Sequence, residues 1–295
     1  MSKKLNIDPI NTWIKNENDP LIISGPCSAE TYDQLFETCK QLKSHGINLM
    51  RAGVWKPRTR PGTFEGNGEE ALKWISDIKK ELDVQFTVEV ANTSHIELAL
   101  KYGIDILWIG ARTTVNPFSV QEIADSLKGT DTPILIKNPI NPDLSLWMGA
   151  LERINKAGIN KLGAIHRGFS MTGKSKYRYI PMWKIAIDLK SNLPNLPVIC
   201  DPSHICGNRD MIFETSQKAL DLGYRIIETD IHSSKDGTAY IFHDNTLERL
   251  TGENLKISDL NDIDIDSLKL NNSSIIPRLS NVFEEFPEGL FNLDA

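Results

Sequence analysis

The stretch from Ile134 to Arg167, ILIKNPINPDLSLWMGALERINKAGINKLGAIHR, contains two short apolar runs separated by a segment with helical periodicity. The first run ends at Lys137 and the second ends at His166 and Arg167. This pattern predicts a strand, a helix over Leu144–Ala157 and a second strand. Repeated units of this kind give a parallel sheet with right-handed crossovers.

The same unit recurs through most of the chain. Seven apolar runs end in residues that can hold a phosphate or a metal ion, and these ends are Gly25-Pro26-Cys27-Ser28, Arg51, Glu89, Gly110-Ala111-Arg112, Lys137, His166-Arg167 and Asp201-Pro202-Ser203-His204. The predicted helices are Tyr32–His45, Glu69–Leu82, Ser94–Tyr102, Ser119–Leu127, Leu144–Ala157, Met182–Ser191 and Asp210–Leu222. Arg225–Glu228 would be the eighth strand. The predicted fold class is α/β, a (β/α)8 TIM barrel with an atypical C-terminal extension, whose active site lies at the carboxyl ends of the strands.

Bulk properties narrow the class of protein. The length of 295 residues suits one barrel of about 250 residues with additions. A net charge of −6 gives no overall positive field that would recruit nucleic acid or acidic lipid. We expect no membrane span, because no apolar stretch reaches about 20 residues. The N-terminus lacks the apolar core of a signal peptide, and four scattered cysteines do not make a disulfide scaffold, so we expect a cytoplasmic protein.

The chain divides into three predicted parts: a lead-in over residues 1–20, the barrel over 21–230 and an extension over 231–295. Within the extension, Thr238–Phe242 is a strand candidate after a Lys235-Asp236-Gly237 turn. A short helix near Leu279–Phe286 and a strand-like Leu290–Leu293 follow. A closed barrel has no obvious place for two further strands, and a terminal strand without a partner would leave an exposed edge.

Cations gather at the predicted strand ends. Arg51, Lys56, Arg58 and the hydroxyl of Thr59 lie within nine residues. Three other strand ends add Arg112, Lys137 and Arg167. Arginine and lysine suit phosphate and carboxylate oxygens, and six cations at one rim would repel each other without an anion. The set predicts a site for one or two small phosphorylated molecules, although Lys56 or Arg58 alone could equally be solvated surface charge.

Three residues are candidate metal ligands. Cys27, His204 and Glu228 would supply a thiolate, an imidazole and a carboxylate, which suit Mn, Fe, Co or Zn. Strands 1 and 7, which precede Cys27 and His204, flank strand 8 in a closed barrel. Taken singly, Cys27 could be a small buried apolar residue and His204 a packed histidine. Cys200 and Cys206 are interpreted as core or loop residues, and His45, His95 and His232 as packing residues.

These motifs resemble a known family over about residues 12–222. The resemblance rests on six segments: Gly25-Pro26-Cys27-Ser28, Lys56-Pro57-Arg58-Thr59, Ile109-Gly110-Ala111-Arg112, Ile136-Lys137-Asn138-Pro139, Ile165-His166-Arg167-Gly168-Phe169 and Asp201-Pro202-Ser203-His204. The family is the 3-deoxy-D-arabino-heptulosonate 7-phosphate (DAHP) synthases of the class I short barrel type, aldol-type transferases that begin the shikimate pathway to chorismate and the aromatic amino acids. Its members are usually homo-oligomers, so we expect a homo-oligomer.

The resemblance implies the condensation of phosphoenolpyruvate with erythrose 4-phosphate and the release of phosphate. It assigns phosphoenolpyruvate to Arg51, Lys56, Arg112, Lys137 and Arg167, and erythrose 4-phosphate to Lys56, Pro57, Arg58 and Thr59. It assigns a divalent metal ion to Cys27, His204 and Glu228. Lys56, Cys27 and His204 are the residues to which it gives catalytic roles.

The resemblance weakens at the last strand. The family carries a Ser-Asp pair after this strand, whose Asp is the fourth metal ligand, and the pair does not follow at the expected place here. Asp236 is the candidate substitute, with Asp230 as the alternative. Activity is therefore expected to be impaired if neither carboxylate completes the site.

Residues 216–295 instead resemble the glycerophosphodiester phosphodiesterases. This second resemblance rests on five segments: Ile227-Glu228-Thr229-Asp230, Lys235-Asp236-Gly237, Phe242-His243-Asp244, Leu247-Glu248-Arg249-Leu250-Thr251-Gly252 and Ile276-Pro277-Arg278-Leu279. In that family the Glu-x-Asp pair binds a divalent cation and the His of His-Asp acts in acid–base catalysis. The chain therefore resembles a fusion. Two alternatives to the synthase remain open, a metal-dependent phosphodiesterase and an inactive fusion product.

Overall fold

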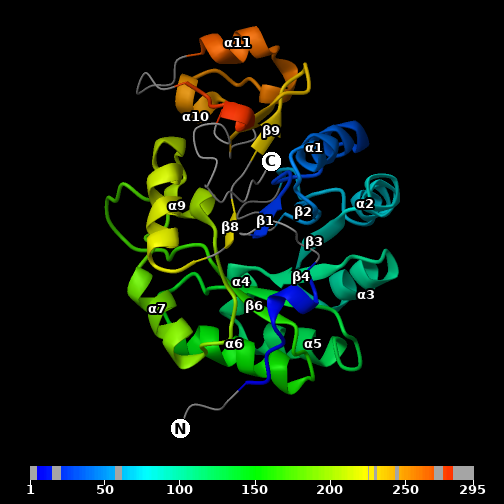
Figure 1. Ribbon diagram of the computed structural model, residues 1–295, viewed down its shortest axis with the longest axis vertical. Helices are drawn as coiled ribbons and strands as arrows, with labels where there is room; N and C mark the ends of the chain where they lie inside the picture. The colour runs from blue at the N-terminus through cyan, green and yellow to red at the C-terminus, as the bar shows by residue number, and fades with distance from the viewer. Residues whose placement is uncertain are drawn as a thin grey trace.

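The structure is a computed structural model, and it describes residues 5–14, 21–56, 62–224, 226–228, 231–242, 246–268 and 275–281. Eight parallel strands form a closed barrel in the order β1 to β8, with helices around it (Figure 1). The strands are β1 (Leu21–Ser24), β2 (Leu49–Arg51), β3 (Gln85–Val90), β4 (Ile106–Ile109), β5 (Ile134–Lys137), β6 (Leu162–His166), β7 (Val198–Cys200) and β8 (Ile226–Glu228). The predicted barrel fold is confirmed.

The eighth strand closes the barrel. β8 pairs in parallel with β1, with Ile23 opposite Glu228, and with β7, with Cys200 opposite Ile227. Closure between the first and last strands brings the loops after β1, β7 and β8 to one side of the barrel mouth. This is the neighbourhood in which the metal ligands were predicted.

Helices alternate with the strands. The chain contains η1 (Ile10–Thr12), α1 (Tyr32–Ser44), α2 (Glu69–Leu82), α3 (Thr93–Lys101), α4 (Ala111–Thr114), α5 (Pro117–Ser126), α6 (Leu144–Lys156), α7 (Trp183–Asn192), α8 (Pro202–Cys206), η2 (Arg209–Met211) and α9 (Ile212–Asp221). Side-chain caps fix several helix starts where turn residues were predicted, since Asn92 accepts from the His95 N–H and Asn116 accepts from the Phe118 and Ser119 N–H groups. Among the described residues, no helix is long and apolar enough to span a bilayer.

Two apolar cores lie on either side of the strands. The larger one fills the space between the strands and the helices, and the smaller one fills the inside of the barrel with residues such as Ile23, Leu49 and Trp108. Trp13 and Ile14 from the lead-in are buried in this inner core. These two residues of the lead-in therefore cover apolar side chains inside the barrel.

The extension forms a small layer on the barrel, at the end of the molecule beyond α1 (Figure 1). Its elements are β9 (Ile231–Ser233), β10 (Ala239–Ile241), α10 (Glu248–Thr251), η3 (Ile257–Asp259) and α11 (Asp262–Ser267). β9 and β10 form an antiparallel hairpin whose turn includes Gly237 at φ 87°. The strand predicted within Thr238–Phe242 and its preceding turn are confirmed.

The hairpin is buried on both faces. Ala239 and Ile241 join the larger core of the barrel, whereas Tyr240 and Phe242 join a third core within the extension. This alternation is the period-two pattern of a strand between two apolar layers. β10 is paired on both sides, because β9 lies on one side and Tyr240 bridges to Arg278 on the other. Leu290–Leu293 lies outside the described residues, as does the predicted helix beyond residue 281.

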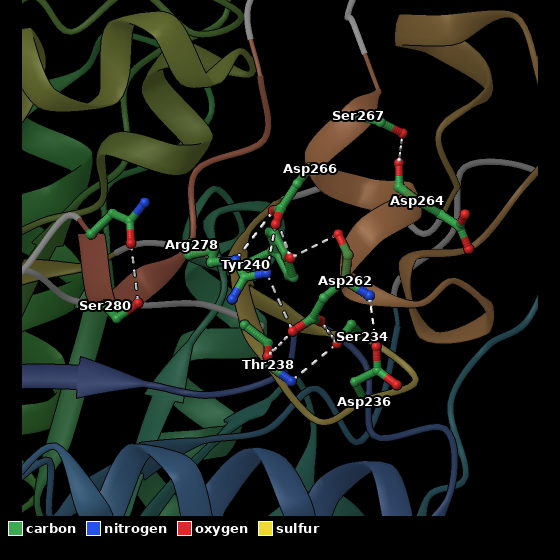
Figure 2. Close-up of polar contacts among 11 residues, drawn as sticks. Ser234, Asp236, Thr238, Tyr240, Asp262, Asp264, Asp266, Ser267, Arg278 and Ser280 are labelled. Atoms are coloured by element: carbon green, nitrogen blue, oxygen red, sulfur yellow. Dashed lines mark hydrogen bonds and ion pairs between the residues drawn. The ribbon is translucent and has the colours of Figure 1, made fainter.

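Polar side chains tie the extension together (Figure 2). The Asp262 carboxylate accepts hydrogen bonds from the Ser234 and Thr238 hydroxyls, both at 2.5 Å. The Asp266 carboxylate accepts from the Tyr240 hydroxyl at 2.8 Å and from the Arg278 guanidinium at 2.5 Å. These contacts join the hairpin, α11 and the segment around Arg278, which are distant in sequence, into one folded layer.

Candidate active site

A cleft of about 360 Å³ opens at the carboxyl ends of the barrel strands. Strands β1 to β7 each supply lining residues, from the strand itself or from the loop or short helix that follows it. The predicted residues that line the cleft are Cys27, Arg51, Lys56, Arg112, Lys137, Arg167 and His204. The cleft therefore brings together side chains that are distant in the sequence, such as Cys27 and His204, which are 177 positions apart.

The indole ring of Trp108 contacts two of the cations that line the cleft, Arg51 and Lys137. The Arg51 guanidinium carbon and the Lys137 ammonium lie 5.0 and 4.8 Å from the centre of the Trp108 ring. The Trp108 N–H donates to the Glu89 carboxylate at 3.1 Å. Arg51 and Lys137 are each only 4% exposed, so their charges are held in a poorly solvated site. Cation–π contacts of this kind offset part of the cost of burying the charges.

Asp201 organises the side of the cleft formed by β7. Its buried carboxylate lies 3.3 Å from the Lys137 ammonium, which makes a buried ion pair. The same carboxylate accepts from the backbone N–H of His204 at 3.0 Å and so caps α8. A single aspartate thus fixes both a cation and an imidazole.

The Asp201 contact also sets the state of the His204 ring. Nδ1 of His204 lies 3.0 Å from the Asp201 carboxylate, so Nδ1 carries a proton and Nε2 is the basic nitrogen. Burial lowers the pKa of His204 well below its usual range, and the charge of Lys137 adds to this effect. The neutral tautomer with a basic Nε2 is the form in which histidine binds a metal ion.

Close packing of two loops places Cys27 beside Lys56. The Gly53 N–H donates to Pro26 at 3.1 Å, and a Cβ at Gly53 would lie 1.8 Å from the Cys27 carbonyl oxygen. Only glycine allows this approach. The Lys56 ammonium donates to the Cys27 carbonyl and lies 3.0 Å from its sulfur.

Asn138 positions Arg167 through the backbone. Its side-chain amide donates to the carbonyls of Pro139 and Gly168, both at 2.8 Å, and its oxygen accepts from the Arg167 N–H at 2.7 Å. Asn138 is fully buried, so these bonds replace all of its hydration. The loops after β5 and β6 are thereby locked together.

Several predicted residues are not brought to the cleft or cannot be placed there. Pro57, Arg58, Thr59 and Asp230 lie outside the described residues. Glu228 is the last residue of β8 and lies between β1 and β7, but its side chain is outside the description. Where side chains are described, no group of three metal-ligating residues is close enough to hold an ion.

Asp236, the candidate fourth ligand, is not among the described residues that line the cleft. It is exposed in the turn between β9 and β10, and its carboxylate accepts the Asp262 backbone N–H at 2.8 Å (Figure 2). The spacing along the chain could not show this, since the partner lies 26 residues further on and belongs to the network of the extension. Asp236 is therefore a contact within the extension in this structure.

Seven other residues complete the lining: Gly53, Trp55, Glu89, Ala111, Ile140, Arg178 and Tyr179. Glu89, at the end of the third apolar run, was predicted at a strand end but was given no role in binding. Trp55 stacks on His95 with ring centres 3.9 Å apart, which agrees with the interpretation of His95 as a packing residue. Arg178 and Tyr179 lie in the loop before α7, where no motif marks them.

Comparison with known proteins shows that the C-terminal part is similar to a family of its own. The glycerophosphoryl diester phosphodiesterase family matches residues 213–294. The probable glycerophosphodiester phosphodiesterase 2 of Mycobacterium tuberculosis is 33% identical over 78 residues, which cover 26% of this chain and 30% of that protein. This likeness is confined to one part of each protein.

The matches over the barrel are more extensive. The phospho-2-dehydro-3-deoxyheptonate aldolase of Thermotoga maritima is 29% identical over 211 residues, which cover 72% of this chain and 60% of that protein. A crystal structure of the phospho-2-dehydro-3-deoxyheptonate aldolase (DAHP synthase) from Thermotoga maritima superposes with a TM-score of 0.66 at 26% identity, covering 76% of this chain and 63% of the other. The DAHP synthetase I family matches residues 4–245, and the chain belongs to this family.

Proposed function

We propose that the chain is a DAHP synthase, which condenses phosphoenolpyruvate with erythrose 4-phosphate and releases inorganic phosphate. The observation that carries the proposal is the convergence of Cys27, Lys56, Arg167 and His204, with three further predicted cations, in one cleft. The chain spans 60% of the length of the curated relative from Thermotoga maritima, so the activity of that whole protein is a proposal for this chain.

The buried cations suit phosphoenolpyruvate. Arg51, Lys137 and Arg167 are at most 7% exposed, and a phosphate and a carboxylate would compensate their charges where water cannot. Held in this way, phosphoenolpyruvate would present its enol carbon to the aldehyde of erythrose 4-phosphate. Carbon–carbon bond formation leaves positive charge at C2, water adds there, and the bond from C2 to the phosphate oxygen breaks. The Glu89 carboxylate lies in the lining and could stabilise that positive charge.

We infer a site for a divalent metal ion in part of the same cleft. The Cys27 thiol comes from the loop after β1 and the basic Nε2 of His204 from α8, which follows β7; β1 and β7 flank β8, whose last residue is Glu228. These three residues would hold Mn, Fe, Co or Zn. When bound, the ion would polarise the aldehyde of erythrose 4-phosphate as a Lewis acid. His204 is held ready for this role by Asp201, independently of any bound ion.

The test is phosphate release by the purified full-length chain, with each substrate omitted in turn and with Mn, Fe, Co or Zn supplied. We expect release only when both substrates and a metal are present. No turnover with any of the four metals would contradict the proposal. Cys27→Ala should abolish Mn binding in a calorimetric titration, whereas Asp236→Ala, which alters a carboxylate outside the cleft, should bind Mn as the wild type does.

A second candidate is a glycerophosphodiester phosphodiesterase, favoured by the family match over residues 213–294. The residues it would need, Asp230 and His243, lie outside the described residues. Release of glycerol 3-phosphate from glycerophosphocholine by the same preparation would support this candidate. If the preparation synthesises DAHP but releases no glycerol 3-phosphate, the phosphodiesterase candidate is rejected.

A further inference from the structure

We propose that Tyr179 is a positioning residue that holds Arg167 and Arg178 as a two-guanidinium wall for the phosphoenolpyruvate anion. The inference rests on the proposed function and extends it to two residues outside the predicted site. All three side chains line the cleft. The guanidinium carbons of Arg167 and Arg178 lie 3.6 and 5.6 Å from the centre of the Tyr179 ring, both within cation–π range.

The loop before α7 is held in place by backbone hydrogen bonds. Phe169 and Ile180 exchange two bonds of 2.9 Å, which make a short antiparallel bridge across the loop. The N–H groups of Arg178 and Tyr179 donate to carbonyls in α8 at 3.2 and 3.1 Å. Because α8 also carries His204, the loop is fixed relative to the rest of the cleft.

Two glycines make room for this arrangement. Gly168 has a φ of 79°, and a Cβ there would lie 2.6 Å from the Tyr179 carbonyl oxygen. Gly207 has a φ of 58°, and a Cβ there would lie 2.4 Å from the Cβ of Arg178. Any other residue would push Arg178 and Tyr179 away from their present positions. The local backbone is thus adapted to bring these two side chains close to the barrel.

The electrostatics agree with the geometry. Burial raises the pKa of the Tyr179 phenol, but nearby positive groups outweigh burial and the net shift is downward. The causes that lower it are the charge of Arg167, a hydrogen bond between the Arg167 and Tyr179 side chains, and the charges of Arg178 and Arg112, in that order. Two guanidiniums on one ring repel each other, and an anion between them would relieve the repulsion. This wall is therefore suited to the phosphate or carboxylate of phosphoenolpyruvate.

The test measures phosphoenolpyruvate binding by calorimetry with the full-length chain, before any turnover. Tyr179→Leu and Arg178→Gln should each weaken binding roughly tenfold, whereas Tyr179→Phe, which keeps the ring, should stay within about threefold of the wild type. Lys176→Gln is the matched control, because it removes a cation from the same loop outside the cleft and should leave binding unchanged. The KM for erythrose 4-phosphate should not change in any variant.

The outcomes separate this inference from the proposed function. If the wild type binds no phosphoenolpyruvate, both are refuted. If the wild type binds it and Arg178→Gln binds equally well, the wall is refuted while the function stands. Arg178 is exposed, so this variant tests the wall even if Tyr179→Leu does not fold. An equal loss in Lys176→Gln would show a general charge effect and would also refute it.

Discussion

At the scale of single residues, Asp201 is the most consequential buried group near the cleft, because it is paired with Lys137 and also caps α8. Asp201→Asn keeps the shape but leaves the Lys137 ammonium buried without its counter-charge. We expect a loss of about 3 kcal/mol in the free energy of unfolding. In a thermal scan this corresponds to a fall in Tm of roughly 5–10 °C.

The matched control for this change is Asp188→Asn on α7. Asp188 pairs with Lys184 at 2.7 Å, but Lys184 is 82% exposed, so water replaces the lost partner. Its Tm should move by less than about 2 °C. If both variants shift Tm equally, the Lys137–Asp201 pair does not hold a desolvated charge.

His166 gives the molecule a built-in dependence on pH. Its Nε2 donates to the Pro181 carbonyl at 2.5 Å, and its Nδ1 accepts from the Tyr224 hydroxyl at 2.9 Å. Burial lowers the pKa of His166 from 6.5 to about 4. In the unfolded chain this histidine binds a proton below pH 6.5, whereas in the folded chain it binds one only near pH 4. The free energy of unfolding therefore decreases as the pH falls from 6.5 to about 4, by up to about 3 kcal/mol.

The measurement is urea unfolding at a series of pH values between 4 and 8. His166→Gln should show a flatter profile than the wild type across the acid interval, because glutamine does not titrate. His45→Gln, at the exposed end of α1, should keep the wild-type profile. Identical profiles for His166→Gln and the wild type would contradict the explanation.

At the scale of elements, apolar runs that end in chemically active residues were sufficient to predict all eight barrel strands. This succeeded because parallel strands buried on both faces are nearly continuous apolar runs. β9 was missed, since Ile231-His232-Ser233 has no apolar run and its strand character depends on pairing with β10. Tyr179 was missed for a similar reason: its place in the cleft depends on contacts with α8 and the space beside Gly168, which no local pattern reveals.

The hairpin yields the prediction for this scale. Ile231 is fully buried in the larger core, so Ile231→Ala should cost about 2–4 kcal/mol of unfolding free energy. The control is Ile263→Ala on α11, where the side chain is 82% exposed and the expected cost is below about 0.5 kcal/mol. Both are measured as shifts of the urea midpoint. A negligible effect of Ile231→Ala would mean that β9 does not stabilise the barrel.

At the scale of the whole molecule, two family likenesses overlap within one chain, over residues 213–245. This overlap includes nearly all of α9 and the whole of β8, the last helix–strand unit of the barrel. The sequence showed where the two patterns meet, but not how the extension packs. Packing depends on which face of β10 meets the barrel, and residues such as Ile241 and Phe242 are equally apolar although they enter different cores.

Because the hairpin contributes to two cores at once, the extension and the barrel should unfold together. We expect a single calorimetric transition for the wild type, with equal calorimetric and van't Hoff enthalpies. Ile265→Ala in the core of the extension and Leu72→Ala in α2 are both changes at fully buried positions, and each should lower the temperature of that one transition. If Ile265→Ala instead produces a separate low-temperature transition, with β10 amides exchanging hydrogen while β3 amides remain protected, the two cores are not coupled through the hairpin.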